Sequence, residues 1–416
     1  MFEFSKELGM MAMNLDMVQS LTFTTIVLLI GSFIKSKVNI FQKYCIPAPV
    51  VGGFSFAIIS FVLRQIGVIA IVFDTTLQGI LMTAFFTTVG FTASFKALKK
   101  GGLGVIKFLV VAVLLVLAQD IIGVLSAKAI GVNPLLGLIA GSVSMTGGHG
   151  ASGAFGPLME AQGLNGALSI AMACATFGLV AGSIVGGPIA NRLIEKYNLG
   201  NKDNEHDNLI DLEAISLDGS GSACKVNLPN LAEASLVSGA IQIIIAMGFG
   251  TIISGIFSSM EITMPSYIGA MLVAAIMRNI SDIKGVWETP ENELSSIGGI
   301  CLSLFLSMAM CSLKLWELID LAVPIIILLS IQTILMILFA YFVTFRMMGK
   351  DYTAAVLSAG HCGFGMGATP NGIANMESVT SKFGPCQGAF FILPLVGALF
   401  IEFFNSAVIT TFINIL

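Results

Sequence analysis

The chain has 416 residues, of which 56% are hydrophobic and only 11% are charged, whereas about a quarter of the residues of an ordinary soluble domain are charged. This composition excludes a soluble globular protein. The net charge of −4 indicates no particular partner, and there is no basic tail for nucleic acid. Apolar runs such as "IKFLVVAVLLVLAQDIIGVL" are long enough to cross a bilayer, so we expect an all-α, multi-span membrane protein.

The first apolar run, at about 20–34, is expected to be a retained transmembrane helix and not a signal peptide. The acidic residues Glu3, Glu7 and Asp16 precede it in place of a cationic segment, and no small-residue cleavage site follows it.

Ten runs are long and apolar enough to be counted as transmembrane helices, and they fall into two sets of five. They lie at about 19–34, 48–66, 75–95, 103–128, 164–188, 233–257, 264–280, 294–313, 321–345 and 386–412.

The distribution of Lys and Arg predicts the orientation of these spans. With the N-terminus outside, only Lys6, Arg64, Lys128 and Lys314 of the 20 basic residues lie outside, and the other 16 lie inside. Because positively charged residues favour the cytoplasmic side, we expect both termini to be outside.

The segment 191–232 is polar and acidic, and we expect it to be a cytoplasmic linker between two halves, 1–190 and 233–416. The halves share motifs in the same order. Pro49 and Gly53 begin the second run of the first half, and Pro265 and Gly269 begin the second run of the other half. Because each half has an odd number of crossings, the second must be inverted, and inverted repeats are typical of secondary transporters.

Two glycine-rich strings, each with a histidine, lie between the fourth and fifth helices of each half: about 141–158 and about 356–378. Since the flanking runs already cross the membrane, we expect each string to form a re-entrant hairpin, the first entering from outside and the second from the cytoplasm. An ordinary pair of flexible loops is the alternative, but "GLIAGSVSM" and "AAVLSAG" are too apolar for solvated loops.

The residues of these strings carry a specific resemblance. "AGSVSMTGGHG", "MACATFGLVAGSIVGGP" and "FVTFRMMGKDYTAAVLSAGHCGFGMGATPNGIANM" resemble the sodium/glutamate symporter family of bacteria. The resemblance covers nearly the whole chain. It implies sodium-coupled uptake of L-glutamate by a homodimer in the bacterial inner membrane, with two inverted five-helix repeats, re-entrant hairpins and an elevator-like mechanism.

A symporter of this kind needs donors for two substrate carboxylates, and no Lys or Arg lies deep in any run. Backbone N–H groups and the hydroxyl and amide side chains of the two strings are the candidates for this task. The predicted substrate-binding residues are Ser144, Thr146, Gly147, Gly148, His149, Gly150, Ser152, Gly360, His361, Gly363, Gly365, Thr369, Asn371 and Asn375. For His149 and His361, a structural hydrogen bond that closes each hairpin is favoured over a metal or proton role, because no cluster of zinc ligands surrounds either one.

Sodium ions, as the co-transported cation, require oxygen ligands. Glu402 and Asn405 share one face of the last run, and an ionisable residue inside a span is a functional candidate. The alternatives for Glu402 are a protonated carboxyl or a partner on another helix. Asp120 and Thr176 are further candidates, although Asp120 stands where relatives commonly have an amide, and a Thr more often bonds to its own helix backbone.

Other functions stay open at this point. A sodium-coupled carrier of another organic anion or a sodium/proton antiporter would have a similar composition, and "FFTTVGF" would suit an antiporter core. A channel would more naturally arrange its repeats around one pore. A membrane-embedded enzyme lacks support, because the chain has no HExxH motif, no GxSxG motif and no pair of aspartates within a span.

Overall fold

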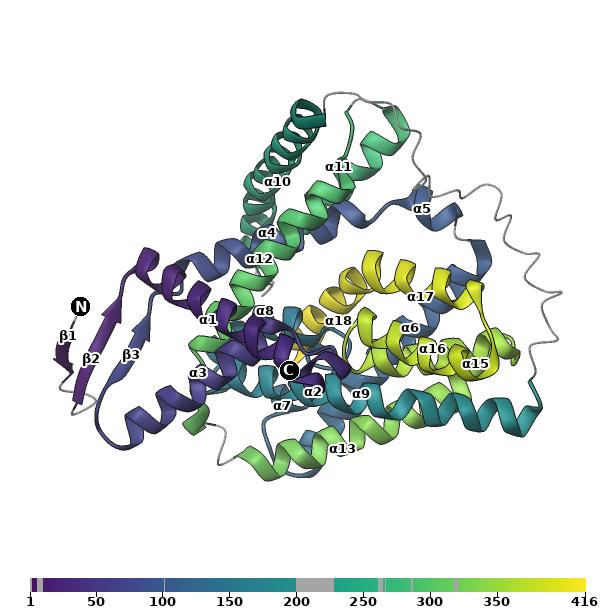
Figure 1. The fold of residues 1–416 in the computed structure, drawn as a ribbon, viewed down its shortest axis with the longest axis horizontal. Coiled ribbons are helices and arrows are strands. Elements are labelled where there is room, and N and C mark those ends of the chain that lie inside the picture. The colour runs from purple at the N-terminus through teal and green to yellow at the C-terminus, as the bar shows by residue number, and fades with distance from the viewer. Residues whose placement is uncertain are drawn as a thin grey trace.

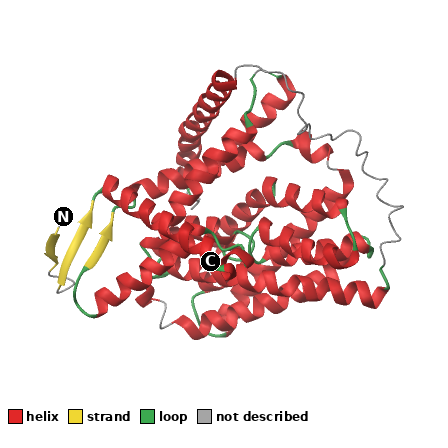
Figure 2. Cartoon of the chain, in the orientation of Figure 1, coloured by secondary structure: helices red, strands yellow, loops and turns green. Residues whose placement is uncertain are grey.

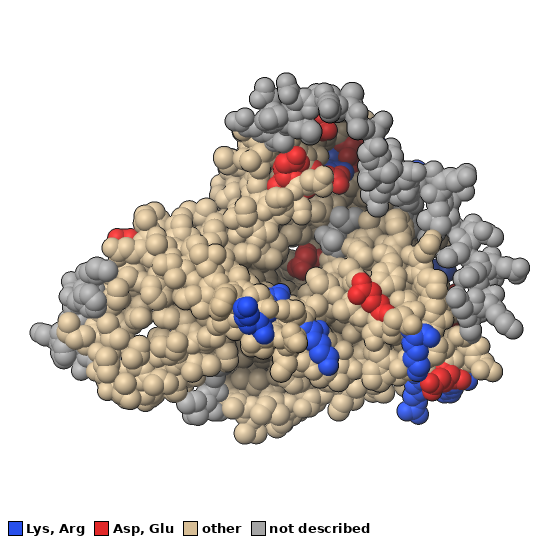
Figure 3. Space-filling model, viewed as in Figure 1, with Lys and Arg blue, Asp and Glu red and all other residues tan. Residues whose placement is uncertain are grey.

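Helices make up nearly all of the protein, as Figures 1 and 2 show. The computed structural model describes residues 2–5, 10–100, 102–199, 228–260, 265, 267–285, 287–317 and 321–416. Most of the face in Figure 3 carries no charged side chain, as expected of a surface that contacts lipid. In such surroundings each peptide group must find its hydrogen-bond partner within the protein, which favours helices.

The first half of the chain contains α1 (Met17–Lys37), α2 (Asn39–Lys43), α3 (Ala48–Gln65), α4 (Thr76–Thr92), α5 (Phe95–Lys100), α6 (Gly102–Ala129), α7 (Pro134–Leu138), the π-helical segment η1 (Ile139–Val143), α8 (Gly148–Ala161) and α9 (Ala167–Tyr197). The second half contains α10 (Leu228–Ser259), α11 (Tyr267–Lys284), α12 (Glu291–Cys311), the short turn η5 (Leu315–Glu317), α13 (Ala322–Phe339), the π-helical segment η7 (Ala340–Thr344), α14 (Phe345–Met347), α15 (Tyr352–Gly365), α16 (Thr369–Phe383), α17 (Gln387–Leu399) and α18 (Ile401–Ile415).

A helix or helix pair stands at each of the ten expected spans, but fewer satisfy the requirements for crossing a membrane. By length and composition, the described residues contain seven helices able to do so, or up to eight if the bent pair α17–α18 counts as one span. The helix α4 has only 17 residues. The last span, expected to be continuous over 386–412, is bent by 44° near Phe400.

Sequence signals explain several helix ends. Asp16 and Gln19 form a reciprocal capping box at the start of α1, with the Asp16 carboxylate accepting from the Gln19 N–H at 2.8 Å. Asn133 caps α7, and Asp351 caps α15 in the same manner, accepting from the Ala354 N–H at 2.7 Å. These caps place the starts of the two glycine-rich strings.

A small three-stranded sheet near the N-terminus was not expected from the sequence. Its strands are β1 (Phe2–Ser5), β2 (Met10–Leu15) and β3 (Ala70–Phe73), with β2 in the centre, antiparallel to β1 and parallel to β3. The sheet projects from the helices at one end of the molecule (Figures 1 and 2). Its strands lie outside the ten predicted spans, so the spans themselves remain helical.

The long helices pack into two groups. We call α1, α3, α4, α10, α11 and α12 the six-helix group, because these helices contact one another extensively. We call α6 to α9 and α13 to α18, with η1 and η7, the hairpin group. Each half of the chain contributes its first three long helices to the six-helix group and the rest to the hairpin group, and Figure 1 shows the two groups beside each other.

Contacts within the six-helix group occur in matching pairs. The helix α3 packs on α12 and α11 packs on α4, while α4 and α12 pack on each other. An added Cβ at Gly53 of α3 would meet Met310, and one at Gly90 of α4 would meet Met271. These glycines therefore permit close approach of helices from different halves.

The segment between the halves is partly helical. The predicted linker was 191–232, but α9 continues to Tyr197 and ends at Asn198, whose φ of 53° is a left-handed helix cap. The next helix begins at Leu228. Residues 200–227 of the linker, which include His206, lie outside the described residues.

Candidate functional site

The first glycine-rich string forms a helical hairpin, which we call hairpin 1 (residues 134–161). It consists of α7, η1 and α8, and the helical path breaks at Gly141, whose ψ is −134°. Asp120 on α6 stabilises this break, because its two carboxylate oxygens accept hydrogen bonds from the Ser142 N–H at 2.8 Å and from the Ser142 hydroxyl at 2.9 Å. Both oxygens of Asp120 therefore have protein partners.

Hydroxyl groups attach hairpin 1 to α9. The hydroxyls of Ser144 and Ser152 both donate to the Ala171 carbonyl, at 3.0 and 3.2 Å. The His149 Nε2 atom lies 3.0 Å from the Thr176 hydroxyl, which also donates to the Met172 carbonyl of its own helix. The expected structural hydrogen bond of His149 is present, but it joins the hairpin to α9 and does not close the hairpin on itself.

The second string forms hairpin 2 (residues 352–383), in which Met366 to Ala368 separate α15 from α16. Asparagine amides attach it to α9. Asn371 Nδ2 donates to the Leu179 carbonyl and to the Ser183 hydroxyl, both at 2.9 Å, and Asn375 Nδ2 donates to the Gly182 carbonyl at 2.9 Å.

The histidine of hairpin 2 has a different set of partners. His361 Nδ1 lies 2.9 Å from the hydroxyl of Thr344, the last residue of η7. The rings of Phe108, Phe339 and Phe364 surround the imidazole, with centroids 5.1, 6.0 and 5.9 Å away. As with His149, the hydrogen bond joins a hairpin to a neighbouring helix.

The tips of the two hairpins meet. Gly148 has a φ of +55°, a conformation that favours glycine, and an added Cβ there would lie 2.8 Å from the Gly367 carbonyl oxygen. Gln119 of α6 connects the same two tips: it accepts a hydrogen bond from the Thr146 hydroxyl and donates one to the Gly365 carbonyl, both at 2.7 Å.

Two helix N-termini are directed to this meeting point. The helix α8 begins at Gly148 and α16 begins at Thr369, and no side chain caps either of them. Uncapped helix N-termini present free N–H groups and a partial positive charge. The N-terminus of α8 can therefore bind an anionic group without any cationic side chain. The N-terminus of α16 offers fewer N–H groups, because Pro370 has none and the Asn371 N–H donates to the Ala368 carbonyl at 3.0 Å.

The helix α18 carries two side-chain oxygens without partners among the described residues, and one of them belongs to a residue that contacts hairpin 1. Asn405 Nδ2 donates to the Ser142 carbonyl at 3.4 Å, while Asn405 Oδ1 and Glu402 Oε2 are buried without a partner among the described residues. Nearby, the Tyr267 hydroxyl bonds to Ser406 at 3.2 Å. Carboxylate and amide oxygens of this kind are suitable ligands for a hard cation such as sodium.

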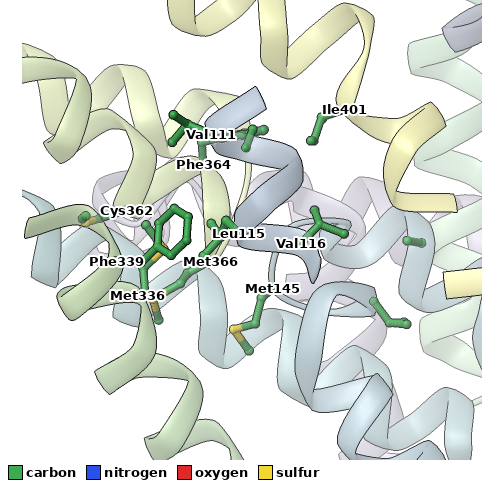
Figure 4. Packing of buried hydrophobic residues seen from close by; sticks show 14 of the residues in the cluster. Val111, Leu115, Val116, Met145, Met336, Phe339, Cys362, Phe364, Met366 and Ile401 are labelled. Atoms are coloured by element: carbon green, nitrogen blue, oxygen red, sulfur yellow. The ribbon is translucent and has the colours of Figure 1, made fainter. Parts of the chain in front are cut away.

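Apolar side chains from several elements enclose the hairpins. Figure 4 shows Leu115 of α6, Met336 of α13 and Ile401 of α18 in the same cluster as Met145 from hairpin 1 and Met366 from hairpin 2. All of these side chains are buried. Such surroundings strengthen electrostatic interactions with any ion or charged group held between the tips.

The predicted site residues thus have three kinds of location. Those at the meeting of the tips are Thr146, Gly147, Gly148 and Gly365, with Thr369 half-buried at the start of α16. Those that contact neighbouring helices are Ser144, His149, Ser152, Thr176, His361, Asn371 and Asn375. Gly150 faces Phe85, and Gly360 and Gly363 permit the close packing of hairpin 2, against Leu393 and Asn371 respectively.

Gln119 and Gln332 are site residues that were not expected from the sequence. Gln332 of α13 donates from Nε2 to the backbone carbonyl of Gln119 at 2.8 Å. Each is a lone glutamine within a very apolar helix, and a buried amide needs partners. An amide residue in such an apolar helix could therefore have been recognised in the sequence as a candidate hydrogen-bonding residue. In the structure both side chains are almost completely buried.

The sequence of the chain is similar to those of known membrane transporters. The family model described as sodium/glutamate symporter matches residues 13–385. The chain belongs to the sodium/glutamate symporter family. It is 40% identical to the sodium/glutamate symporter of Haemophilus influenzae, over 94% of this chain and 95% of that protein. It is 39% identical to the sodium/glutamate symporter of Escherichia coli, over 96% of this chain and 98% of that one. Members of this family are multi-pass membrane transporters and not enzymes.

Proposed function

We propose that this protein is a secondary active transporter that carries L-glutamate together with sodium ions into the cell by alternating access. Membership of the family supports the two substrates. The structural observation that carries the proposal is the meeting of two helical hairpins at the uncapped N-termini of α8 and α16.

Glutamate has two carboxylates and one ammonium group, and the meeting point has matching chemistry. The N-termini of α8 and α16 each suit one carboxylate. Asn371 Oδ1 is a buried acceptor without a partner among the described residues, and it suits the ammonium group. Gly148 permits close approach of backbone at the meeting point, because an added Cβ there would meet only the Gly367 carbonyl group.

Sodium is expected at the oxygens of Glu402 and Asn405, and the Ser142 carbonyl of hairpin 1 lies beside Asn405. Both side-chain oxygens are buried and without partners among the described residues, and a buried carboxylate without a counter-charge is costly. Asp120 and Thr176 fit this role less well, because their side-chain oxygens already have protein partners.

The two halves are proposed to be inverted five-helix repeats, each with a re-entrant hairpin. The matching contacts of α3 with α12 and of α11 with α4 support this relation. Hairpin 1 would then open to the outside and hairpin 2 to the cytoplasm, so that one site is reached alternately from each face. The sparse contacts between the six-helix group and the hairpin group support an elevator-like movement of the hairpin group.

The orientation and assembly are proposed from the charges and the family. The distribution of Lys and Arg supports both termini outside and residues 191–232 in the cytoplasm. The family resemblance supports a location in the bacterial inner membrane. The resemblance supports a homodimer. Single cysteines placed at 205–225 should react only from the cytoplasmic side, and labelling from outside intact cells would overturn both the orientation and the inverted repeats.

Reconstitution tests the transport proposal directly. Liposomes containing the purified protein should accumulate labelled L-glutamate when sodium is higher outside, and a potassium gradient of the same size should give no accumulation. Unlabelled glutamate inside should accelerate exchange, which a channel would not do. If another organic anion were accumulated in its place, or if sodium moved with pH alone, the substrate assignment would be wrong.

A further inference from the structure

Gln119 is the residue that joins the two hairpins. Its side-chain oxygen accepts from the Thr146 hydroxyl of hairpin 1, and its side-chain nitrogen donates to the Gly365 carbonyl of hairpin 2, both at 2.7 Å. The Thr146 hydroxyl also lies 3.4 Å from the same carbonyl. One amide thus connects residues that are far apart in the sequence.

The chemistry of this link requires an amide. A glutamine has both an acceptor and a donor on one planar group, whereas a glutamate carboxylate has only acceptors. The exposed fraction of the side chain is 1% for Gln119 and 5% for Thr146. Because water cannot replace a lost partner at such a buried site, the link is sensitive to the relative position of the hairpins.

Gln119 is held in place by a hydrogen bond to its backbone and by the contacts of the next residue, Asp120. The Gln119 carbonyl accepts from Gln332 of α13 at 2.8 Å. Gly123 permits this approach, since an added Cβ there would lie 3.1 Å from Gln332 Nε2. The adjacent Asp120 binds Ser142, so two consecutive residues of α6 hold the break and the tip of hairpin 1.

Asn405, one of the two proposed sodium ligands, contacts the same hairpin. Asn405 bonds to the Ser142 carbonyl of hairpin 1, and an added Cβ at Gly147 would lie 2.7 Å from Asn405 Nδ2. A continuous series of contacts therefore runs from Asn405 through hairpin 1 and Gln119 to Gly365 in hairpin 2.

We propose that Gln119 is a positioning residue that couples the two hairpins, so that sodium bound near Asn405 raises the affinity of the hairpins for glutamate. This inference rests on the proposed function, in which the hairpin tips hold the substrate. Sodium that restricts the position of hairpin 1 also restricts Thr146. Because Gln119 is bonded to both Thr146 and the Gly365 carbonyl, the position of hairpin 2 is then restricted as well. Linkage requires the reverse effect of equal size, in which glutamate raises the affinity for sodium.

The test measures the sodium enhancement factor, which is the ratio of the glutamate dissociation constants at low and at saturating sodium. It uses the purified full-length protein in lipid nanodiscs. Gln119→Glu keeps the shape and the Thr146 bond but loses the donor to Gly365, and Gln119→Met loses both bonds. We expect each variant to lower the enhancement factor at least tenfold, with a smaller change in glutamate affinity at saturating sodium.

Gln242→Glu is the matched control. Gln242 on α10 is 7% exposed, and its side-chain nitrogen donates to the Glu288 carbonyl at 2.9 Å, but it lies in the six-helix group away from the hairpins. We expect this variant to lose stability to a similar degree and to keep the enhancement factor within twofold. A purely structural role for Gln119 would give the same result as this control.

The outcomes separate the coupling role from the function. A wild-type protein whose glutamate affinity does not depend on sodium would overturn both. A sodium-dependent wild type together with an unchanged enhancement factor in folded Gln119→Met would overturn the coupling role alone. Should Gln119→Met fail to fold, Gln119→Glu and Thr146→Val decide, because each removes one bond at nearly constant volume. Unchanged factors in those two would likewise overturn the proposal.

Discussion

Hairpin 1 and hairpin 2 occupy corresponding places in the two halves, but different chemistry holds them. Hydroxyl groups attach hairpin 1, through Ser144 and Ser152 to the carbonyl of Ala171. Amides attach hairpin 2, through Asn371 and Asn375 to carbonyls farther along the same helix. Both hairpins therefore use α9 as a common support, although α9 belongs to the first half of the chain.

The helices that follow the hairpins also differ. The helix α9 is continuous over 31 residues, whereas its counterpart is bent at Phe400 between α17 and α18. From the bent helix, Asn405 reaches only hairpin 1 among the described contacts of its side chain. Similar topology in the two halves thus does not lead to similar chemistry, and the two hairpins are expected to respond differently to substitution.

The largest loss of glutamate uptake is expected from substitution of Gly363, where α15 packs closely against α16 in hairpin 2. An added Cβ at Gly363 would lie 2.5 Å from the Asn371 carbonyl oxygen and 2.6 Å from the Gly372 nitrogen, which are backbone atoms that cannot move independently. Gly363→Val should therefore abolish glutamate uptake in liposomes while the protein still folds. Gly187→Ala on α9 is the control, because nothing lies within 4 Å of a Cβ there. Normal uptake by Gly363→Val would exclude hairpin 2 as the substrate site.

The second largest effect, a loss of sodium affinity, is expected from substitution of Glu402 in α18. Glu402→Gln keeps the shape and removes the charge that is proposed to bind sodium. The sodium concentration for half-maximal uptake should rise about tenfold or more, with little change in glutamate affinity at saturating sodium. The sodium dependence of initial uptake rates measures this. An unchanged sodium dependence would mean that the carboxyl is structural and that sodium binds elsewhere.

Removal of an attaching amide from hairpin 2 should have an intermediate effect. Asn371→Ala loses two hydrogen bonds to α9 and the free oxygen proposed for the ammonium group. We expect the apparent glutamate constant to rise about tenfold, equivalent to about 1.4 kcal/mol, and Thr369→Ala to behave similarly. Asn375→Ala loses only attachment to α9 and Ala359, so an equal rise in that variant would indicate that Asn371 also acts through attachment alone.

The smallest effect on uptake is expected from substitution of Asp120, which stabilises the helix break of hairpin 1. Asp120→Asn keeps one oxygen to accept from the Ser142 N–H, and the new amide can donate to the Ser142 hydroxyl. Uptake and its sodium dependence should change less than threefold. A large loss of sodium affinity in Asp120→Asn would assign Asp120 to the sodium site, which the present hydrogen bonds do not favour.

The sequence by itself determined the class of the protein and the order of its elements. Hydrophobic runs long enough for a bilayer, the charges between them and the two glycine-rich strings predicted a helical membrane transporter, and the motifs within the strings identified its family. Local signals also explain particular helix ends, as at Asp351, because a cap interacts with residues only three positions away. Such features depend on neighbours in the chain, which a sequence displays directly.

Only the tertiary structure decided which of the polar residues are bonded to one another. Asn371 and Asp120 looked alike as candidate ligands, but the first has a free oxygen and the second has none. Gln119 attracted no attention in the sequence, because its partners lie 27 and 246 residues away. The bend at Phe400 was equally hidden within an apolar run. The physical reason is that a hydrogen bond depends on distance in space, and the close packing that brings α6 against both hairpins comes from contacts spread over the whole chain.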